Sequence, residues 1–199
     1  MLYLIRHGQT AYNLARRYQG ALDSPLTSLG ESQAVMAGRR LATLVPADTP
    51  IVAGPLGRAQ RTAELIKEAG GFTGPVLTEP RITEITLGRW DGMTDEEIEV
   101  FFPKAREGAT RFNWFFAAPD GETYQGFSQR LGSWLKEALA GPQPLIAVSH
   151  GVASRVLRGL YTGLTAEAGL ELATPQDAFF CLAGGAIQRI ECEECATGA

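Results

Sequence analysis

The feature that most constrains this chain is a pair of short apolar runs, each of which ends abruptly in His-Gly. The first run, residues 2–5, leads through one arginine to His7, and the second, residues 145–149, leads to His150. These are the only two histidines in the sequence. Continuous runs of Val, Ile and Leu are typical of parallel strands that are covered on both faces. Ligands of open α/β sheets bind beyond the carboxyl ends of such strands. If the two strands are neighbours, both imidazoles lie at one edge of the sheet.

Length and composition limit the class of protein. The 199 residues suit a single domain that spans residues 1–199. Apolar residues make up 45% and charged residues 20%, which disfavours a disordered or fibrous chain. The net charge of −4 and the pI of about 5.3 disfavour nucleic-acid binding. The sequence has no apolar run of 18 residues, and its start lacks the features of a signal peptide. We therefore expect a cytoplasmic protein that acts without a membrane.

The three cysteines do not form the framework of a secreted disulfide protein. Cys192 and Cys195 have the spacing of a zinc or redox motif, but they lie in an acidic tail, residues 191–199, without a nearby histidine. Two thiolates alone do not complete a tetrahedral zinc site. We predict a solvated terminus here.

Predicted strands and helices alternate along the rest of the chain. A capping-box spacing at Ser28 and Glu31 predicts a helix, and the same spacing at Thr94 and Glu97 predicts another that ends at Pro103. Further helices are predicted after residue 57, over about 127–139 and over about 152–160, and strands at 51–53, 76–77, 178–183 and 186–190. Two glycines between the last two strands indicate a hairpin. The pattern predicts an α/β fold, a three-layer α/β/α sandwich with a mostly parallel central sheet.

Two arginines carry positive charge at the predicted strand ends. Arg6 follows the first strand, and Arg58 lies at the start of the helix that follows strand 51–53. A guanidinium group binds phosphate oxygens as a bidentate fork, and a helix N-terminus adds free N–H groups. The pattern therefore predicts a pocket for a dianionic phosphoryl group.

His7 could act as a general base, a metal ligand or a nucleophile. A metal ion would need further His, Asp or Glu side chains at ligand spacing, and we find no such cluster in the sequence, so we expect no metal and no cofactor. A nucleophilic imidazole needs an unprotonated ring nitrogen, with positive groups around the phosphoryl oxygens. Arg6, Arg58 and a protonated His150 are the candidates for those groups.

With these residues in place, the sequence resembles the histidine phosphatase superfamily, the phosphoglycerate mutase-like proteins. The resemblance spans residues 2 to about 155 in unbroken order, and the combination of motifs is highly specific. The matching segments are Leu4-Ile5-Arg6-His7-Gly8-Gln9-Thr10-Ala11-Tyr12-Asn13, Gln19-Gly20, Asp23-Ser24-Pro25-Leu26-Thr27, the stretch 54–63, Glu84 with Gly88-Arg89-Trp90-Asp91-Gly92, and Ser149-His150-Gly151.

This resemblance implies a phosphoglycerate mutase-like fold and a phosphohistidine intermediate formed without metal. It implies that His7 is phosphorylated and that Arg6, Arg58 and His150 form the phosphate pocket. It also implies that Asn13 and the Gln19-Gly20 turn contact the substrate, a small-molecule phosphate ester. We add Gly151, which follows His150, to the substrate-binding candidates.

Hydrolysis also needs an acid for the leaving group and a base for water, and one carboxyl group can alternate between these roles. Glu84 aligns with the acid/base glutamate of the family. Its neighbours Ile82 and Ile85 predict partly apolar surroundings, which would favour the protonated form. Glu122 is the competing candidate, in a segment similar to the family's Pro-Gly-Glu-Ser turn but with Thr123 in place of the serine.

The family contains both phosphatases and mutases. Cofactor-dependent phosphoglycerate mutases usually carry an arginine directly after the acid/base glutamate, where this chain has Ile85, and Trp90-Asp91-Gly92 resembles the phosphatase branch. We therefore predict a metal-independent phosphomonoesterase for small organic phosphates, a phosphoric monoester hydrolase of the histidine acid phosphatase type. The alternatives are a cofactor-dependent phosphoglycerate mutase and a phosphate-binding module with little turnover.

Three features stay open on sequence alone. The aromatic cluster of Phe112 and residues 114–116 could form an apolar lid over the pocket or pack in the core. Arg16 and Arg17 could form a second anion site or a solvated loop. A homodimer through an edge strand or an apolar helix is a further alternative.

Overall fold

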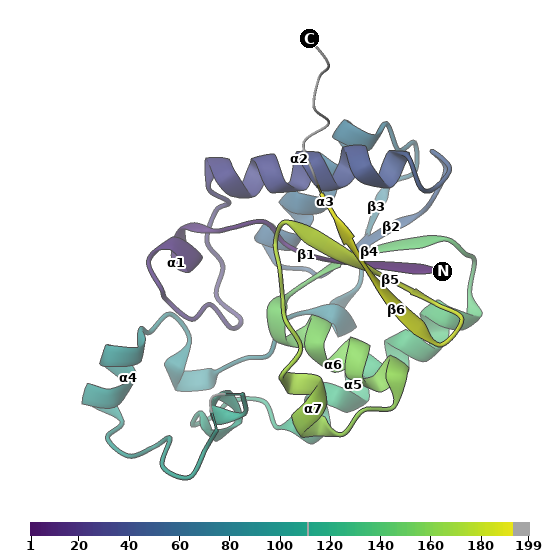
Figure 1. The fold of residues 1–199 in the computed structure, drawn as a ribbon. Helices are drawn as coiled ribbons and strands as arrows, with labels where there is room; N and C mark the ends of the chain where they lie inside the picture. The colour runs from purple at the N-terminus through teal and green to yellow at the C-terminus, as the bar shows by residue number, and fades with distance from the viewer. Residues whose placement is uncertain (111, 193–199) are drawn as a thin grey trace.

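The computed structural model describes residues 1–110 and 112–192, which form a six-stranded sheet between two layers of helices (Figure 1). The strand order is β3-β2-β4-β1-β5-β6. The first four strands of that order are parallel, β5 is antiparallel to β1, and β6 is antiparallel to β5. The predicted α/β fold with a mostly parallel sheet is thereby confirmed. The strands are β1 (Leu2–Arg6), β2 (Ile51–Ala53), β3 (Val76–Thr78), β4 (Leu145–Ser149), β5 (Ala178–Ala183) and β6 (Ala186–Glu191).

Two groups of helices cover the sheet from opposite sides. In Figure 1, α2 and α3 lie above the sheet, and α5, α6 and α7 lie below it. The short helices α1 and α4 lie at the left, beyond the carboxyl ends of the parallel strands. The helices are α1 (Ala11–Leu14), α2 (Ser28–Ala42), α3 (Gly57–Gly70), α4 (Asp95–Phe101), α5 (Tyr124–Ala140), α6 (Gly151–Thr162) and α7 (Ala166–Leu170), with single 3₁₀ turns η1 (Pro80–Ile82), η2 (Gly88–Trp90) and η3 (Trp114–Ala117).

The core has two halves, one on each face of the sheet. Alternate residues of β1 point to opposite faces: Leu2 and Leu4 pack with residues of α5 and α6, whereas Tyr3 and Ile5 pack with residues of α2 and α3. All four side chains are buried. A strand that is covered on both faces must be apolar at every position, which explains the unbroken apolar run that leads to His7.

The helix starts agree with the sequence pattern in one case and differ in the other. At α4, Thr94 and Glu97 form the expected capping box. At α2, the capping residue is Thr27 rather than Ser28, because the Thr27 hydroxyl accepts a hydrogen bond from the N–H group of Gly30. Glu31 instead forms an ion pair with Arg61 of α3, 3.1 Å away. The predicted capping box at Ser28 is therefore wrong, because Thr27, one residue earlier, caps the helix without a reciprocal partner.

The C-terminal strands form the predicted hairpin, and the two glycines that join them have φ values of +57° and +78°. The prediction of a solvated terminus is wrong at Cys192. The Cys192 side chain is buried. The backbone N–H group of Cys192 donates to the carbonyl oxygen of Asp177, so the strand pairing extends past β6. Burial raises the pKa of the Cys192 thiol to about 11. Cys195 lies outside the described residues.

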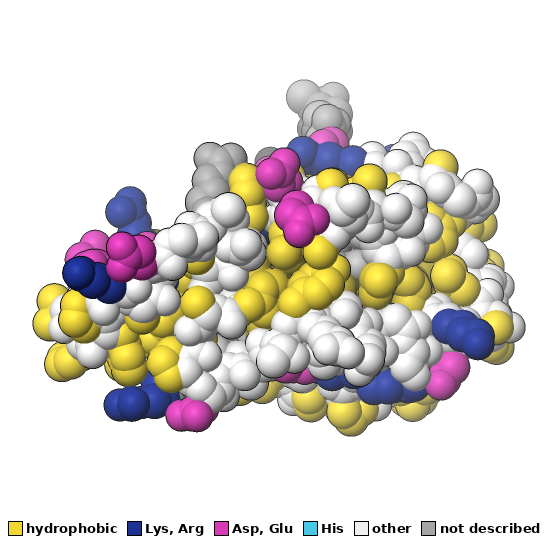
Figure 2. Space-filling model, turned by 90° about the horizontal axis from the view of Figure 1, so that it is seen from below, with side chains coloured by type: hydrophobic (Ala, Val, Ile, Leu, Met, Phe, Trp, Pro, Cys, Tyr) yellow, Lys and Arg dark blue, Asp and Glu magenta, His cyan; other side chains and the backbone are white. Residues whose placement is uncertain are grey.

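None of the helices formed by the described residues combines the length and the apolar character needed to cross a bilayer. Figure 2 shows one face of the molecule, on which apolar side chains gather across the middle and most charged groups lie toward the margins.

Candidate active site

The two His-Gly motifs meet because β1 and β4 are adjacent and parallel. Arg6 pairs with Ser149 at the end of this ladder, and the N–H group of His7 donates to the Ser149 carbonyl at 3.0 Å. The next residues are His7 and His150, whose ring centroids are 5.3 Å apart. Both imidazoles are buried, with exposed fractions of 3% and 0%. The prediction that both rings lie at one edge of the sheet is confirmed.

The backbone of the next residue, Gly8, holds the ring of His7. Its Nδ1 atom lies 2.8 Å from the carbonyl oxygen of Gly8, which can only accept a hydrogen bond. Nδ1 is therefore the protonated nitrogen, and Nε2 keeps a free lone pair. Burial lowers the pKa of His7 well below 6.5, and the charges of Arg6 and Arg58 lower it further. The ring is consequently neutral at pH 7, as a nucleophile must be.

His150 differs from His7 in its partners. Neither ring nitrogen makes a hydrogen bond with a described residue, although both atoms are fully buried. Burial lowers the pKa of His150 well below 6.5, and Arg58 and His7 add to this effect. Without a bound anion His150 is therefore neutral at pH 7, and its protonation stays a prediction for the phosphate-bound site. A phosphoryl dianion beside the ring would add negative charge and favour protonation.

A cavity of about 280 Å³ opens at this edge of the sheet. It contains eight of the nine residues that the sequence analysis placed in the site, whereas His150 lies buried beside His7 and is not part of the cavity wall. The predicted residues in the wall are Arg6, His7, Asn13, Gln19, Gly20, Arg58, Glu84 and Gly151. Residues that are far apart in the sequence thus form one compact pocket.

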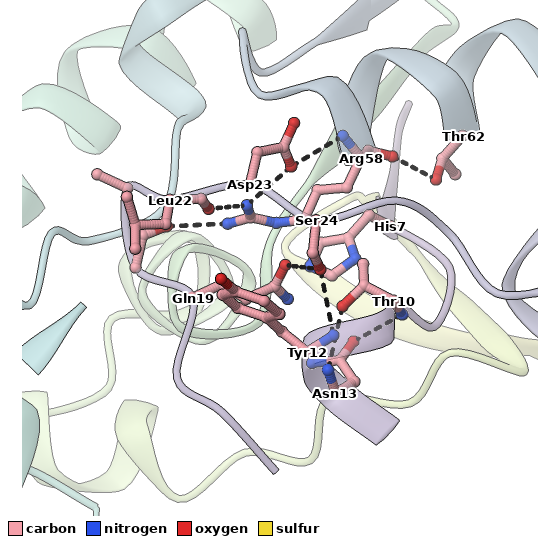
Figure 3. A network of polar contacts seen from close by, with 12 residues as sticks. His7, Thr10, Tyr12, Asn13, Gln19, Leu22, Asp23, Ser24, Arg58 and Thr62 are labelled. Atoms are coloured by element: carbon pink, nitrogen blue, oxygen red, sulfur yellow. Dashed lines mark hydrogen bonds and ion pairs between the residues drawn. The ribbon is translucent and has the colours of Figure 1, made fainter. Parts of the chain in front are cut away.

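Arg58 is held rigidly at the N-terminus of α3 (Figure 3). Its guanidinium group donates to the carbonyl oxygens of Leu22 and Gly20 at 2.6 and 2.9 Å, and forms an ion pair with Asp23 at 3.2 Å. Its Nε atom is buried without a hydrogen-bond partner. Burial lowers the pKa of Arg58, whereas the carboxylates of Glu84 and Asp23 oppose that shift. Such a side chain keeps its position when an anion approaches.

Arg6 approaches from the end of β1. Its Nη1 atom donates to the carbonyl oxygen of Thr174 at 2.7 Å, and its Nε atom is buried without a partner. Burial lowers the pKa of Arg6 to about 10, and the nearby Glu84 carboxylate opposes the shift. The group is therefore charged at pH 7. A half-buried cation whose Nε–H group is buried and unpartnered is well suited to bind an anion.

Helix α1 and the loop after it position the smaller polar groups, Asn13 and Gln19. The Oδ1 atom of Asn13 accepts hydrogen bonds from the Thr10 N–H group and from the Nε2 group of Gln176, so its Nδ2 group is left to the cavity. Gln19 accepts a hydrogen bond from the Ser24 hydroxyl (Figure 3). Both predicted side chains therefore have fixed amide groups at the cavity wall.

No residue with a side chain fits at the position of Gly20. Its φ is +50°, and a Cβ atom there would lie 1.6 Å from Oδ1 of Asp91. Asp91 in turn accepts hydrogen bonds from the N–H groups of Ala21 and Leu87. The acidic residue of the Trp90-Asp91-Gly92 motif thus ties two loops of the cavity wall together.

The surroundings of Glu84 differ from the expectation. Its carboxylate accepts hydrogen bonds from the N–H groups of Val152 and Ala153 in the first turn of α6, both at 3.0 Å, and from that of Ile85 at 3.1 Å. Ile82 packs in the core, whereas the buried Ile85 also forms part of the cavity wall. The oxygen atoms of Glu84 therefore have polar partners, while the cavity wall near them is partly apolar. One oxygen still faces the site, since a Cβ atom on Gly151 would lie 3.7 Å from it.

Glu122, the competing candidate for the acid/base, has a structural role. Glu122 forms a two-point ion pair with Arg130, at 2.7 and 2.8 Å, and is not part of the cavity wall. Arg130 also donates to the carbonyl oxygens of Arg81, Thr83 and Glu84. Glu122 thus acts through Arg130 to fix the backbone that carries Glu84.

The aromatic cluster packs in the core, and two of its residues also form part of the cavity wall. Phe115 is 5% exposed, and Trp114 packs against Trp90 and Tyr18 at centroid distances of 5.9 and 4.5 Å. Trp114 and Phe115 also form part of the cavity wall. One apolar wall therefore faces the charged residues, while its back is anchored in the core.

Arg17 is not a free cation, although its side chain is 36% exposed and Arg16 beside it is exposed, as in the predicted solvated loop. Arg17 forms a two-point ion pair with Glu97 of α4 at 2.7 and 2.8 Å and donates to the carbonyl oxygen of Gly92. No local pattern around Arg17 indicates this partner, 80 residues away.

Sequence reasoning missed several residues of the cavity wall, and two of them, Arg155 and Thr174, are polar residues close to Arg6. Arg155 lies four residues after Gly151 in α6, and this helical spacing could have placed it on the side of the helix that faces the site. Thr174 follows α7, and only the tertiary fold brings its carbonyl group to Arg6. Among residues 1–110 and 112–192, no group of three His, Cys, Asp or Glu side chains could hold a metal ion.

Comparison with known proteins identifies the class. Residues 2–183 match the model of the histidine phosphatase superfamily, branch 1. The chain is 39% identical over 175 residues to a probable phosphoglycerate mutase GpmB of Erwinia tasmaniensis, covering 84% of this chain and 77% of that protein. The chain belongs to the histidine phosphatase superfamily.

Solved structures add phosphatases to these relatives. Bacillus stearothermophilus YhfR is 30% identical, with a TM-score of 0.80 over 94% of this chain and 93% of that one. A mycobacterial glucosyl-3-phosphoglycerate phosphatase is also 30% identical, with a TM-score of 0.72 over 90% of each chain. The fold is therefore shared with a phosphatase, and the sequence with a probable mutase.

Proposed function

We propose that this protein is a metal-independent phosphomonoesterase that acts on small organic phosphates through a phosphohistidine at His7. The observation that carries the proposal is the hydrogen bond from Nδ1 of His7 to the Gly8 carbonyl, which leaves Nε2 unprotonated in a pocket that contains Arg6 and Arg58. A neutral imidazole beside fixed positive charge is the arrangement that attack on a phosphoryl dianion requires.

In the first step, Nε2 of His7 attacks phosphorus, and the bond from phosphorus to the leaving oxygen breaks. Arg6, Arg58 and a protonated His150 stabilise the phosphoryl oxygens, and Glu84 gives a proton to the leaving group. In the second step, Glu84 removes a proton from water, whose oxygen attacks phosphorus and releases phosphate from Nε2. Its hydrogen bonds to the first turn of α6 fix the carboxylate for both steps.

A phosphoglycerate mutase is the second candidate, favoured by the name of the relative from Erwinia tasmaniensis. Two features favour hydrolysis instead. Arg106 is held by Asp95 and lies over the ring of Trp114, and Lys104 is absent from the cavity wall. The basic residues described between positions 103 and 119 therefore do not line the pocket, whereas the aromatic side chains of Trp114 and Phe115 do.

A binding module with little turnover is the third candidate. It would be expected to lack one of the reacting groups, whereas His7, Arg6, Arg58, Glu84 and His150 are all present. Their close packing at the edge of the sheet favours an enzyme.

The deciding experiment measures phosphate release from a panel of phosphomonoesters in the presence of a chelator. The panel includes 3-phosphoglycerate, because the names of two similar proteins contain phosphoglycerate. We expect release from several esters and a phosphorylated protein after rapid quenching. His7→Asn should abolish both, whereas Glu84→Gln should slow release and still allow labelling by an ester with a good leaving group. Conversion of 3-phosphoglycerate to its 2-isomer only after priming with bisphosphoglycerate, without phosphate release, would identify a mutase.

A further inference from the structure

The segment after α7 is held by three arginines. The carbonyl oxygens of three successive residues, 172–174, each accept a hydrogen bond from a different guanidinium group. Arg155 donates to the first at 2.8 Å, Arg158 to the second at 2.6 Å and Arg6 to the third at 2.7 Å. Neutral carbonyl groups orient these cations but do not cancel their charge, so the cavity keeps an excess of positive charge.

The four described arginines of the cavity wall differ in their partners. Arg17 is neutralised by Glu97, and Arg58 is paired with Asp23. Arg6 lies beside the catalytic candidates, with its Nε group unpartnered. Arg155 uses only Nε, and its two terminal nitrogens make no hydrogen bond or ion pair with a described residue. Glu84 interacts with Arg155 only at long range, and its oxygens already accept three backbone hydrogen bonds.

We propose that Arg155 is a specificity-determining residue that binds a second anionic group, a carboxylate or a second phosphate, on the leaving group of the substrate. This inference rests on the proposed phosphatase function. Because Nε is fixed to the Leu172 carbonyl, the two terminal nitrogens form an oriented fork, which suits bidentate binding of an anion. The aromatic wall of Trp114 and Phe115 would contact the carbon skeleton between the two anionic ends.

The experiment compares matched esters that differ in the second group. One arm pairs phosphoglycolate with ethyl phosphate and 3-phosphoglycerate with glycerol 3-phosphate, and a second arm pairs 1,3-propanediol bisphosphate with propyl phosphate. In the wild-type protein we expect kcat/KM to be about 10- to 100-fold higher for the ester with the second anionic group in at least one arm, mainly through KM, as expected for one charge-assisted bidentate contact. The arm with the larger ratio identifies a carboxylate or a second phosphate as the group that Arg155 binds.

Arg155→Gln should reduce this ratio to near 1, and Arg155→Lys should retain part of it. Arg158→Lys is the matched control, because it disturbs the same segment from a buried position that is not part of the cavity wall. The control should keep the ratio. A wild-type ratio near 1 in both arms, an unchanged ratio in Arg155→Gln, or an equal loss in Arg158→Lys would overturn the proposal.

A binding measurement separates this proposal from the phosphatase function. Calorimetric titration of His7→Asn with the same ester pairs needs no turnover, and it should show tighter binding of the doubly anionic ester only while Arg155 is present. If wild-type protein releases no phosphate but this preference remains, the phosphatase function fails and the second anion site stands. Equal affinities for both members of each pair would contradict the site, whatever the activity.

Discussion

The two His-Gly junctions begin alike and end differently. After β1, Gly8 enters a loop that contacts the start of α2, and its carbonyl group orients the His7 ring. After β4, His150 is the residue that precedes α6, and the N–H groups of that helix bind Glu84 rather than the histidine. The same short pattern therefore yields one ring with a fixed tautomer and one ring with no described partner on either nitrogen. The glycine belongs to a loop in one case and begins a helix in the other, and this difference accompanies the difference in the hydrogen-bond partners of the two rings.

This difference suggests different catalytic roles for His7 and His150. A ring with Nδ1–H bound to a carbonyl presents a lone pair at Nε2, which suits a nucleophile. A buried ring without partners can gain a proton when an anion arrives and then donate it to a phosphoryl oxygen. Exchange of either histidine should therefore affect a different step.

The largest expected effect is on catalysis. His7→Asn removes the nucleophile, and we expect kcat/KM to fall by at least about 10⁴-fold with no phosphorylated protein. His150→Asn removes one stabilising contact to the phosphoryl oxygens, and we expect a loss of about 10²- to 10³-fold with a phosphoenzyme that still forms slowly. Rapid-quench mass spectrometry with phosphate-release kinetics would measure both. A phosphoenzyme in His7→Asn, or none in His150→Asn on a longer time scale, would reverse the assigned roles.

The glycines after the two histidines provide the next comparison. A Cβ atom on Gly8 would lie 2.2 Å from the carbonyl oxygen of Gly30, so Gly8→Ala must displace backbone and should cost about 1–3 kcal/mol of unfolding free energy. A Cβ atom on Gly151 would meet nothing closer than the Nε atom of Arg6, at 3.6 Å. Gly151→Ala should therefore change the unfolding free energy by less than about 1 kcal/mol, since alanine also favours a helix.

Urea unfolding of both variants at one pH measures this difference. Because the added methyl group at Gly151 would stand between Arg6 and Glu84, we expect KM for a small phosphomonoester to rise in Gly151→Ala while stability is kept. Equal destabilisation by the two substitutions would mean that the close approach of Gly8 to α2 does not constrain the fold.

The parts of the molecule that local patterns encode were predictable from the sequence. The apolar runs of β1 and β4 predicted buried parallel strands, and their common ending placed His7 and His150 at one edge. The arginine at the start of α3 followed from the same logic, because a helix N-terminus after a strand points into such a site.

The parts that depend on distant contacts were not predictable. Two of the three N–H groups that bind Glu84 lie 68 and 69 residues away in α6, so its neighbours along the chain could not reveal these partners. The partner of Arg17 is equally remote, and the carbonyl oxygen that orients Arg155 lies in the segment after α7. Cys192 is buried because the β5–β6 pairing continues into the start of the segment whose acidic composition predicted a solvated tail. In each case tertiary packing, and not local chemistry, sets the environment.

The smallest effect concerns stability as a function of pH. Burial lowers the pKa of His7 and of His150 well below 6.5 in the folded protein, whereas both rings titrate near 6.5 in the unfolded chain. Below pH 6.5 the unfolded state therefore binds more protons, and the free energy of unfolding must fall as the pH falls. Each histidine should contribute about 1 kcal/mol per pH unit, and carboxylates with lowered pKa values add their effect only at lower pH.

Urea unfolding between pH 7.5 and 5 tests this expectation. The wild-type protein should lose stability steadily below pH 6.5, and each of His7→Asn and His150→Asn should remove about half of the slope, because each eliminates one group that must stay neutral in the fold. The two variants should thus differ strongly in catalysis yet agree in this slope, since burial is common to both rings while the hydrogen bond to Gly8 is not. A slope that only one variant reduces would show that the other ring accepts a proton within the folded protein.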